Sequence, residues 1–250
     1  MTQHSARPWP YPRWVAHRGA GTLAPENTLA AFRKGAEHGY RMFECDAKLS
    51  ADDVVFLMHD ATLHRTTNGH GIGGDLNWQQ LSQLDAGSWH SRNFSGEPLP
   101  TLEQVAQYCI GQGFFLNIEI KPTPGTEFKT GQVVAQLAAK IWQHETVQPL
   151  LTSFQVESLK AALIVSPHLP RGLLLHQWNE GCLEAAIKLQ CRAVVCQHSL
   201  WTTSTVRAVH QAGMKCLSYT VNDEWAAQHL LQMGTDGIIT DRVDLFSPAA

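Results

Sequence analysis

Two acidic side chains, Glu44 and Asp46, lie two residues apart in the run from Met42 to Leu49, whose pattern is typical of a strand. Side chains alternate along a strand, so we expect both carboxylates on the same face. Two neighbouring carboxylates repel each other, and burying them without a partner is costly. Hard divalent cations bind carboxylate oxygens and would relieve this repulsion. The pair therefore indicates a candidate metal site.

A second strand-like run follows closely, from Val54 to Asp60. Only residues 50–53 separate the two runs, and so short a connection favours a β-hairpin over a crossover helix. A hairpin would return His59 to about the level of the acidic pair. We therefore expect an imidazole beside the candidate metal site.

The run from Phe114 to Lys121 also reads as a strand, and Glu119 and Lys121 share one of its faces. Charges inside a core are costly unless they are paired or bind a ligand. Glu119 would complete an oxygen cage with the two acids of the earlier run, and such a cage suits Mg²⁺ or Ca²⁺. We predict one divalent cation bound by Glu44, Asp46 and Glu119, with Mg²⁺ favoured and Ca²⁺ as the alternative.

Cationic and imidazole side chains complete the candidate site. Arg18 and Lys121 would supply fixed positive charge for an anionic group, and a guanidinium suits paired contacts with phosphate. His17 and His59 would share proton transfer, one as general base and the other as general acid. The sequence does not indicate which histidine has which role. A metal, two cations and two imidazoles around one oxyanion predict phosphoryl transfer.

The elements that must position these residues alternate between strand and helix patterns, which favours parallel pairing through crossover units. Nine runs are typical of strands, and setting aside the return arm of the hairpin leaves eight, the number that closes a (β/α)8 barrel. An open doubly wound sheet is the alternative, but no GxGxxG turn supports it. We therefore predict an α/β fold of the TIM-barrel type, whose active sites lie at the C-terminal ends of the strands. The strand-like runs are 14–18, 42–49, 54–59, 114–121, 150–154, 171–175, 193–196, 215–221 and 237–241.

Residues 60–100 interrupt the alternation, because they are rich in glycine and proline around one short helical pattern. We interpret them as an insertion or lid, since long structureless loops are uncommon unless they are functional. Residues 1–13 indicate an irregular arm with three prolines. Residues 1–250 are predicted to form a single barrel domain with this insertion. Trp225 and Phe94 are expected to pack in the core or the insertion rather than line the substrate entrance.

Composition excludes several classes of function. The formal net charge is -3 and no cluster of lysine and arginine occurs, so no nucleic-acid partner is expected. No apolar run approaches the roughly 20 residues of a membrane span, and the N-terminus lacks the apolar core of a signal peptide. The six cysteines are scattered without a CxxC pair, which is typical of reduced thiols. We therefore expect a cytoplasmic protein without membrane insertion, and its oligomeric state is not indicated.

Five motifs, taken in order, resemble those of the glycerophosphodiester phosphodiesterase family, especially its short cytosolic bacterial members. The motifs are His17-Arg18-Gly19, Pro25-Glu26-Asn27-Thr28, Glu44-x-Asp46, His59-Asp60 and Glu119-Ile120-Lys121. The resemblance extends over nearly the whole chain, from about Trp14 to Asp241. It implies a TIM barrel of the phospholipase-C-like phosphodiesterase type, with a small inserted segment after a hairpin near the second strand.

The resemblance also implies an activity, the metal-dependent hydrolysis of small sn-glycerol-3-phosphodiesters such as glycerophosphocholine and glycerophosphoethanolamine. The products would be sn-glycerol 3-phosphate and an alcohol. Attack by the 2-hydroxyl of the substrate through a cyclic phosphate and direct attack by water use the same residues, so the sequence favours neither. The implied roles are metal ligation by Glu44, Asp46 and Glu119, acid/base catalysis by His17 and His59, and phosphate binding by Arg18 and Lys121.

Two other functions fit parts of the pattern. A related barrel phosphodiesterase acting on lysophospholipids would require an apolar approach surface or a membrane anchor, and the sequence shows neither clearly. A degenerate barrel that only binds glycerophosphodiesters would have lost a metal ligand or a histidine, and none is missing. Glu26 and Asn27 fit the start of a helix as well as a place in the site.

Overall fold

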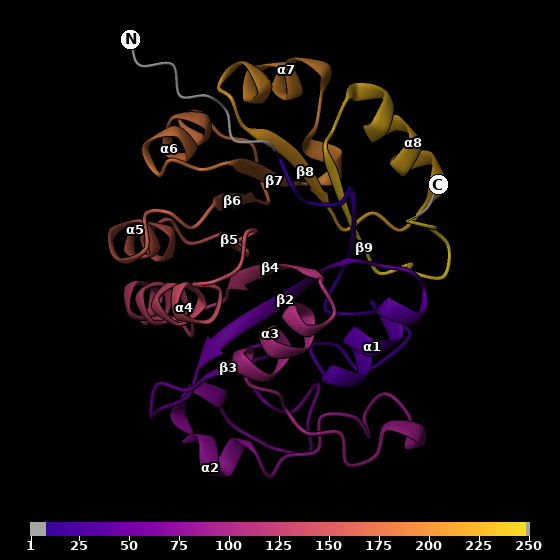
Figure 1. Ribbon diagram of the computed structural model, residues 1–250, viewed down its shortest axis with the longest axis vertical. Helices are drawn as coiled ribbons and strands as arrows, with labels where there is room; N and C mark the ends of the chain where they lie inside the picture. The colour runs from indigo at the N-terminus through magenta and orange to yellow at the C-terminus, as the bar shows by residue number, and fades with distance from the viewer. Residues whose placement is uncertain (1–8, 249–250) are drawn as a thin grey trace.

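A closed barrel of eight parallel strands forms the centre of residues 9–248, the part of the chain that the computed structural model describes (Figure 1). The strands pair in the order β1-β9-β8-β7-β6-β5-β4-β2, and pairing of β1 with β2 closes the ring. This confirms the predicted TIM barrel and excludes the open doubly wound sheet. The eight strands are β1 (Trp14–Ala16), β2 (Met42–Leu49), β4 (Phe115–Ile120), β5 (Leu150–Ser153), β6 (Arg171–Leu175), β7 (Ala193–Gln197), β8 (Lys215–Tyr219) and β9 (Gly237–Thr240).

The short strand β3 (Val55–Leu57) lies outside the barrel and pairs with the far end of β2. The pairing is antiparallel and places Ala47 opposite Leu57. The backbone N–H of Met58 then donates to the carbonyl oxygen of Asp46 at 2.9 Å, which carries the chain back toward the barrel. The predicted hairpin is confirmed, and it delivers His59 to the level of the acidic pair.

Helices surround the strands on the outside of the barrel (Figure 1). No helix within residues 9–248 is both long and apolar enough to cross a membrane. The outward side chains of the strands pack against the helices, and Cys45, between the two acids of β2, is one of them. The helices are α1 (Leu29–Glu37), α2 (Trp78–Leu81), α3 (Leu102–Gly111), α4 (Glu127–Ile141), α5 (Val156–Val165), α6 (Cys182–Lys188), α7 (Thr203–Gln211) and α8 (Glu224–Met233).

The interior of the barrel changes from apolar to polar along its axis. Val15, Met42, Leu150 and Ile239 belong to one buried cluster near the beginnings of their strands, and Tyr11 of the arm packs against it. This part of the predicted arm, which is irregular, covers the N-terminal end of the barrel, while residues 1–8 of the arm lie outside the described residues. Polar side chains are therefore confined to the next layer, toward the C-terminal ends of the strands.

The segment between β3 and α3 carries α2 and two short 3₁₀ turns, Gly73–Asp75 and Arg92–Phe94. Its side chains share an apolar cluster with β3, in which Leu63 and Leu81 of the segment and Phe56 of β3 are fully buried. This cluster is separate from those between the strands and the barrel helices. The segment thus packs around its own small core beside the hairpin.

The expectation for Trp225 is wrong. Its side chain lies in the first turn of α8 and is 74% exposed, because the buried face of that helix is formed by Ala226, Ala227 and Leu230. The indole ring stacks on His229, one turn along the helix, with ring centroids 5.3 Å apart. Phe94, by contrast, is partly buried against the main apolar cluster, as predicted.

Helix α1 approaches the loop after β1 very closely, because two glycines face each other there. A Cβ atom added at Gly35 would overlap the carbonyl oxygen of Gly19 and lie 2.8 Å from Cε1 of Phe43. Gly19 itself has a φ of +98°, a conformation that side chains disfavour. Because both positions are glycine, α1 packs directly against the loop that carries His17 and Arg18.

We predict opposite effects for two glycine-to-alanine substitutions in helices. Gly35→Ala should lower the free energy of unfolding by about 1–3 kcal/mol, because the added methyl overpacks the contact with Gly19. Gly111→Ala should raise it by roughly 0.5–1 kcal/mol, because no atom lies within 4 Å of the added methyl and alanine favours a helix. Urea denaturation measures both, and equal changes of the same sign would contradict the close-contact argument.

Candidate active site

Strand register brings the candidate residues to one level near the C-terminal end of the barrel. The pairing of β1 with β2 and β9 places His17 beside Glu44 and Asp241. The pairing of β2 with β4 places Asp46 opposite Glu119. The site is therefore assembled by neighbouring strands whose inward side chains meet, as expected for a barrel of this type.

Three buried carboxylates, those of Glu44, Asp46 and Glu119, form the centre of the site. Each offers one oxygen, and these oxygens lie within 4.8 Å of one another. Burial and the neighbouring charge of Asp46 raise the pKa values of Glu44 and Glu119. Burial also opposes ionisation of Asp46, but the cations of Arg18 and Lys121 lower its pKa below the ordinary value. Burial and mutual repulsion therefore oppose ionisation of all three carboxylates together, and the neighbouring cations outweigh this opposition only at Asp46.

The cluster fits a hard divalent cation. Oε1 of Glu44 is buried and has no hydrogen-bond partner within residues 9–248, which is rare for a carboxylate oxygen in a protein interior. All three side chains offer oxygen only, the donor type that suits Mg²⁺ and Ca²⁺ rather than softer metals. The structure thus brings together the three residues that the sequence predicts as metal ligands, Glu44, Asp46 and Glu119.

His17 lies at the edge of the carboxylate cluster. Its Nδ1 lies 2.6 Å from Oδ1 of Asp241, and its Nε2 lies 3.8 Å from Oε2 of Glu44. An ionised carboxylate can only accept, so Nδ1 carries a proton and Nε2 faces the cluster. Burial disfavours the imidazolium, but the hydrogen bond to Asp241 and the charge of Glu44 outweigh it and raise the pKa of His17. Asn222 donates to the other oxygen of Asp241 at 2.9 Å.

His59 also has an aspartate at Nδ1. The distance from Nδ1 to Oδ1 of Asp60 is 2.7 Å. Burial lowers the pKa of His59, and the charge of Asp46 opposes this shift only in part. Both candidate histidines therefore share one arrangement, in which an aspartate holds Nδ1 and leaves Nε2 for the site.

Arg18 and Lys121 contact the acids from two sides. Nη1 of Arg18 donates to Glu26 at 2.9 Å, and its Nε lies 3.4 Å from Oδ2 of Asp46. Nζ of Lys121 donates to Oε1 of Glu119 at 2.7 Å and lies 3.8 Å from Oδ1 of Asp46. Both cations thus border the carboxylate cluster, which is where the sequence places the phosphate-binding groups.

Two residues that the sequence left undecided belong to the site as well as to the start of α1. Nδ2 of Asn27 donates to Oδ2 of Asp46 at 2.8 Å, and its Oδ1 accepts from the backbone N–H of Asp46 at 3.0 Å. Asn27 has a φ of +60°, a conformation that asparagine tolerates better than most residues. Glu26 meets Arg18, while Thr28 caps the helix. The helix start therefore also orients a buried acid.

Sequence reasoning assigned no role to four residues of this network: Asp241, Asn222, Arg65 and Lys48. Asp241 directly follows β9, and its position at a C-terminal strand end was the available signal. Lys48 follows the two acids on the same face of β2, and its Nζ donates to the carbonyl oxygen of Lys121 at 2.9 Å. Burial lowers the pKa of Lys48 to about 8.

A cleft of about 480 Å³ opens beside the carboxylate cluster. His59, Lys121 and Lys48 line it together with apolar side chains, among them Phe154, over whose ring the Lys121 ammonium lies at 5.3 Å from the centroid. Acidic, cationic and imidazole groups therefore face one space that a small anionic molecule could enter.

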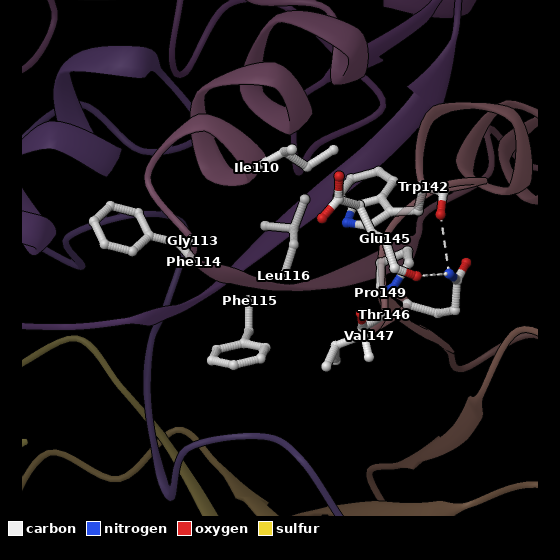
Figure 2. Close-up of a pocket in the computed structure, with 11 residues that line it drawn as sticks. Ile110, Gly113, Phe114, Phe115, Leu116, Trp142, Glu145, Thr146, Val147 and Pro149 are labelled. Carbon is white, nitrogen blue, oxygen red and sulfur yellow. Dashed lines mark hydrogen bonds between the residues drawn. The ribbon is translucent and has the colours of Figure 1, made fainter.

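A smaller pocket of about 180 Å³ lies at the opposite end of the barrel (Figure 2). Phe115, Trp142 and Pro149 line it near the beginnings of β4 and β5, and Gln148 donates to the carbonyl oxygens of Trp142 and Glu145. None of the candidate site residues lines this pocket. This pocket is therefore not part of the candidate active site.

Comparison with known proteins agrees with this geometry. The profile of the "Glycerophosphoryl diester phosphodiesterase family" matches residues 17–245. A glycerophosphodiester phosphodiesterase of Caldanaerobacter subterraneus is 32% identical over 231 residues, which cover 91% of this chain and 93% of that protein.

Solved structures resemble the fold over its full extent. An Oleispira antarctica phosphodiesterase, solved with the product sn-glycerol-3-phosphate, is 30% identical with a TM-score of 0.88, covering 96% of this chain and 97% of that one. A glycerophosphodiester phosphodiesterase of Agrobacterium tumefaciens is 26% identical with a TM-score of 0.80, covering 96% and 100%. Because the family profile and these relatives span nearly the whole chain, the protein belongs to the glycerophosphoryl diester phosphodiesterase family and is an enzyme of that kind.

Proposed function

We propose that this enzyme hydrolyses sn-glycerol-3-phosphodiesters of small alcohols, such as glycerophosphocholine and glycerophosphoethanolamine, to sn-glycerol 3-phosphate and the alcohol. The proposal includes a divalent cation, Mg²⁺ or Ca²⁺, bound by Glu44, Asp46 and Glu119. It also includes acid/base catalysis by His17 and His59. The six free cysteines, five of them buried, fit an enzyme of the reducing cytoplasm.

One observation carries the proposal: three buried carboxylates lie close together, and each of the two candidate histidines has its Nδ1 atom held by an aspartate. Structural acids in a barrel core would be paired with cations one by one. Here an oxygen of Glu44 is left without a partner, and two imidazole Nε2 atoms are left for exchange of protons. This arrangement supports the cleavage of a phosphodiester.

Each group has a task in that reaction. A bound divalent cation supplies Lewis-acid polarisation of phosphate oxygens. Arg18 and Lys121 stabilise the negative charge that builds up on the phosphate oxygens as the P–O bond breaks. One histidine accepts a proton from the nucleophile at Nε2, and the other donates its proton to the departing alkoxide. The nucleophile is either water or the 2-hydroxyl of the glycerol, which would give a cyclic phosphate first.

Release of glycerol 3-phosphate from glycerophosphocholine tests the proposed reaction directly. We expect release with added Mg²⁺ or Ca²⁺ and none with excess chelator. His59→Ala and Glu119→Ala should each lower kcat by roughly 10²–10⁴-fold, because they remove a proton-transfer group and a metal ligand. His64→Ala and Glu103→Ala change exposed residues of the same types and should leave kcat unchanged. Folded enzyme that releases no product with either metal from any glycerophosphodiester would contradict the proposal, and lysophospholipids would be assayed next.

Asp241→Asn should lower kcat on the order of 10²-fold, because the asparagine amide no longer fixes the tautomer of His17 that carries its proton on Nδ1. Asp244→Asn is the matched control, since Asp244 lies in the same loop and pairs with exposed Arg242. Steady-state kinetics on one diester, with circular dichroism to show that both variants fold, measures the difference. Equal kcat values for the two variants would show that His17 does not need this carboxylate.

Mg²⁺ should stabilise the folded enzyme, because it relieves the repulsion among the buried carboxylates. At a concentration near 100 times its Kd, the gain is about 2.7 kcal/mol, or roughly 5–10 °C in Tm for a chain of this size. Glu44→Gln should lose most of this gain and, in chelator, be at least as stable as the unsubstituted enzyme. Thermal denaturation checks both statements, and an undiminished Mg²⁺ effect in Glu44→Gln would exclude Glu44 as a ligand.

A further inference from the structure

Arg65 connects the inserted segment to two sides of the site. Its Nε and Nη2 donate to the two oxygens of Asp60 at 2.6 and 3.1 Å. Its Nη1 and Nη2 donate to the two oxygens of Glu26, both at 2.8 Å. One guanidinium therefore bridges two carboxylates with paired hydrogen bonds, the geometry that this side chain provides and an ammonium does not.

The first carboxylate, Asp60, is the partner of a catalytic candidate. Oδ1 of Asp60 meets Nδ1 of His59 at 2.7 Å, while Arg65 occupies both oxygens from the other side. The hydrogen bond from Arg65 lowers the pKa of Asp60. The Asp60 carboxylate therefore stays ionised and accepts a hydrogen bond from the N–H at Nδ1 of His59. Without Arg65, the half-buried Asp60 side chain, which directly follows the hairpin, would have no second contact to define its rotamer.

The second carboxylate, Glu26, is the partner of a phosphate-binding candidate. Oε1 of Glu26 accepts from Nη1 of Arg18 at 2.9 Å as well as from Nη2 of Arg65. Burial opposes ionisation of Glu26, but its two arginine partners lower the pKa. Arg65 thus holds the carboxylate of Glu26, and Glu26 in turn orients the side chain of Arg18.

We propose that Arg65 is a positioning residue for the diester hydrolysis, acting on His59 through Asp60 and on Arg18 through Glu26. Arg65 belongs neither to the carboxylate cluster nor to the residues that line the cleft, and it reaches the cleft lining only through Asp60. Its side chain is 40% exposed, so solvent weakens these ion pairs, although their paired geometry makes them stronger than an isolated surface pair. The bridge fixes the geometry of the site, and the Tm values of Arg65 variants measure how much it also stabilises the fold. The inference rests on the function proposed above.

Steady-state kinetics on Arg65→Met, Arg65→Lys and Arg92→Met tests the inference. Arg92 is an exposed arginine of the same inserted segment outside the network, so Arg92→Met should keep the kcat of the unsubstituted enzyme. Arg65→Met should lower kcat about 10–100-fold, the usual effect of removing a group that orients a site residue. Arg65→Lys should recover only part of this loss, because an ammonium cannot pair with both carboxylates. The Tm values of all three variants should stay close to that of the unsubstituted enzyme.

Two further readouts separate positioning from a structural role. In a background of Asp60→Asn with Glu26→Gln, adding Arg65→Met should change kcat less than about two-fold, because residues that act as a unit are not additive. Imidazole ¹⁵N spectra should show the proton of His59 localised on Nδ1 in the unsubstituted enzyme and shared between both nitrogens in Arg65→Met.

The outcomes are distinct. Equal kcat for Arg65→Met and Arg92→Met would overturn the inference, as would a loss of kcat explained entirely by a lower fraction of folded protein. If Arg65→Met lowers kcat by the same factor in the background of Asp60→Asn with Glu26→Gln as it does alone, the inference is overturned too. Arg65 would then act by a route that involves neither carboxylate. Absence of activity in the unsubstituted enzyme would instead contradict the proposed function, and the ¹⁵N spectra would still test the contact with His59.

Discussion

Repulsion among three carboxylates in one small buried volume is the constraint on which the rest of the site depends. Glu44, Asp46 and Glu119 cannot be placed so close together without compensation. The protein supplies part of it, from Lys121 beside Glu119 and from the backbone N–H of Arg18, which donates to Glu44 at 3.0 Å. It leaves part of the repulsion uncompensated, and that deficit of positive charge is the basis on which we propose a divalent cation at the cluster.

Barrel closure and site assembly cannot be separated. His17 and its carboxylate partner Asp241 are 224 positions apart in the chain, and they meet only because β1 pairs with β9. His59 and Asp60 are neighbours in sequence and need the hairpin and the inserted segment instead. One histidine is thus positioned by the ring of strands and the other by a local turn, so the two members of the proposed acid/base pair depend on different parts of the fold.

The barrel and the main cluster could be predicted from sequence because they rest on short-range regularities. Alternation of strand and helix patterns predicts the eight strands, and spacing by two predicts Glu44 with Asp46. The supporting contacts of Asp241 and Arg65 could not be predicted, since they join segments whose relative placement exists only after folding. Trp225 was misjudged for a related reason: its size favours burial, but the apolar stripe of α8 runs through Ala226, Ala227 and Leu230 and leaves it outside.

The separate apolar cluster of the inserted segment has a consequence for how the enzyme can diversify. Phe56, Leu63 and Leu81 pack with one another rather than with the barrel clusters, so substitutions there are absorbed locally. The inserted segment can then change in sequence while the ring of strands stays constant, provided that the guanidinium bridge from Arg65 to Asp60 and Glu26 is kept. Divergence among relatives should therefore concentrate in this part of the chain and leave the barrel strands unchanged.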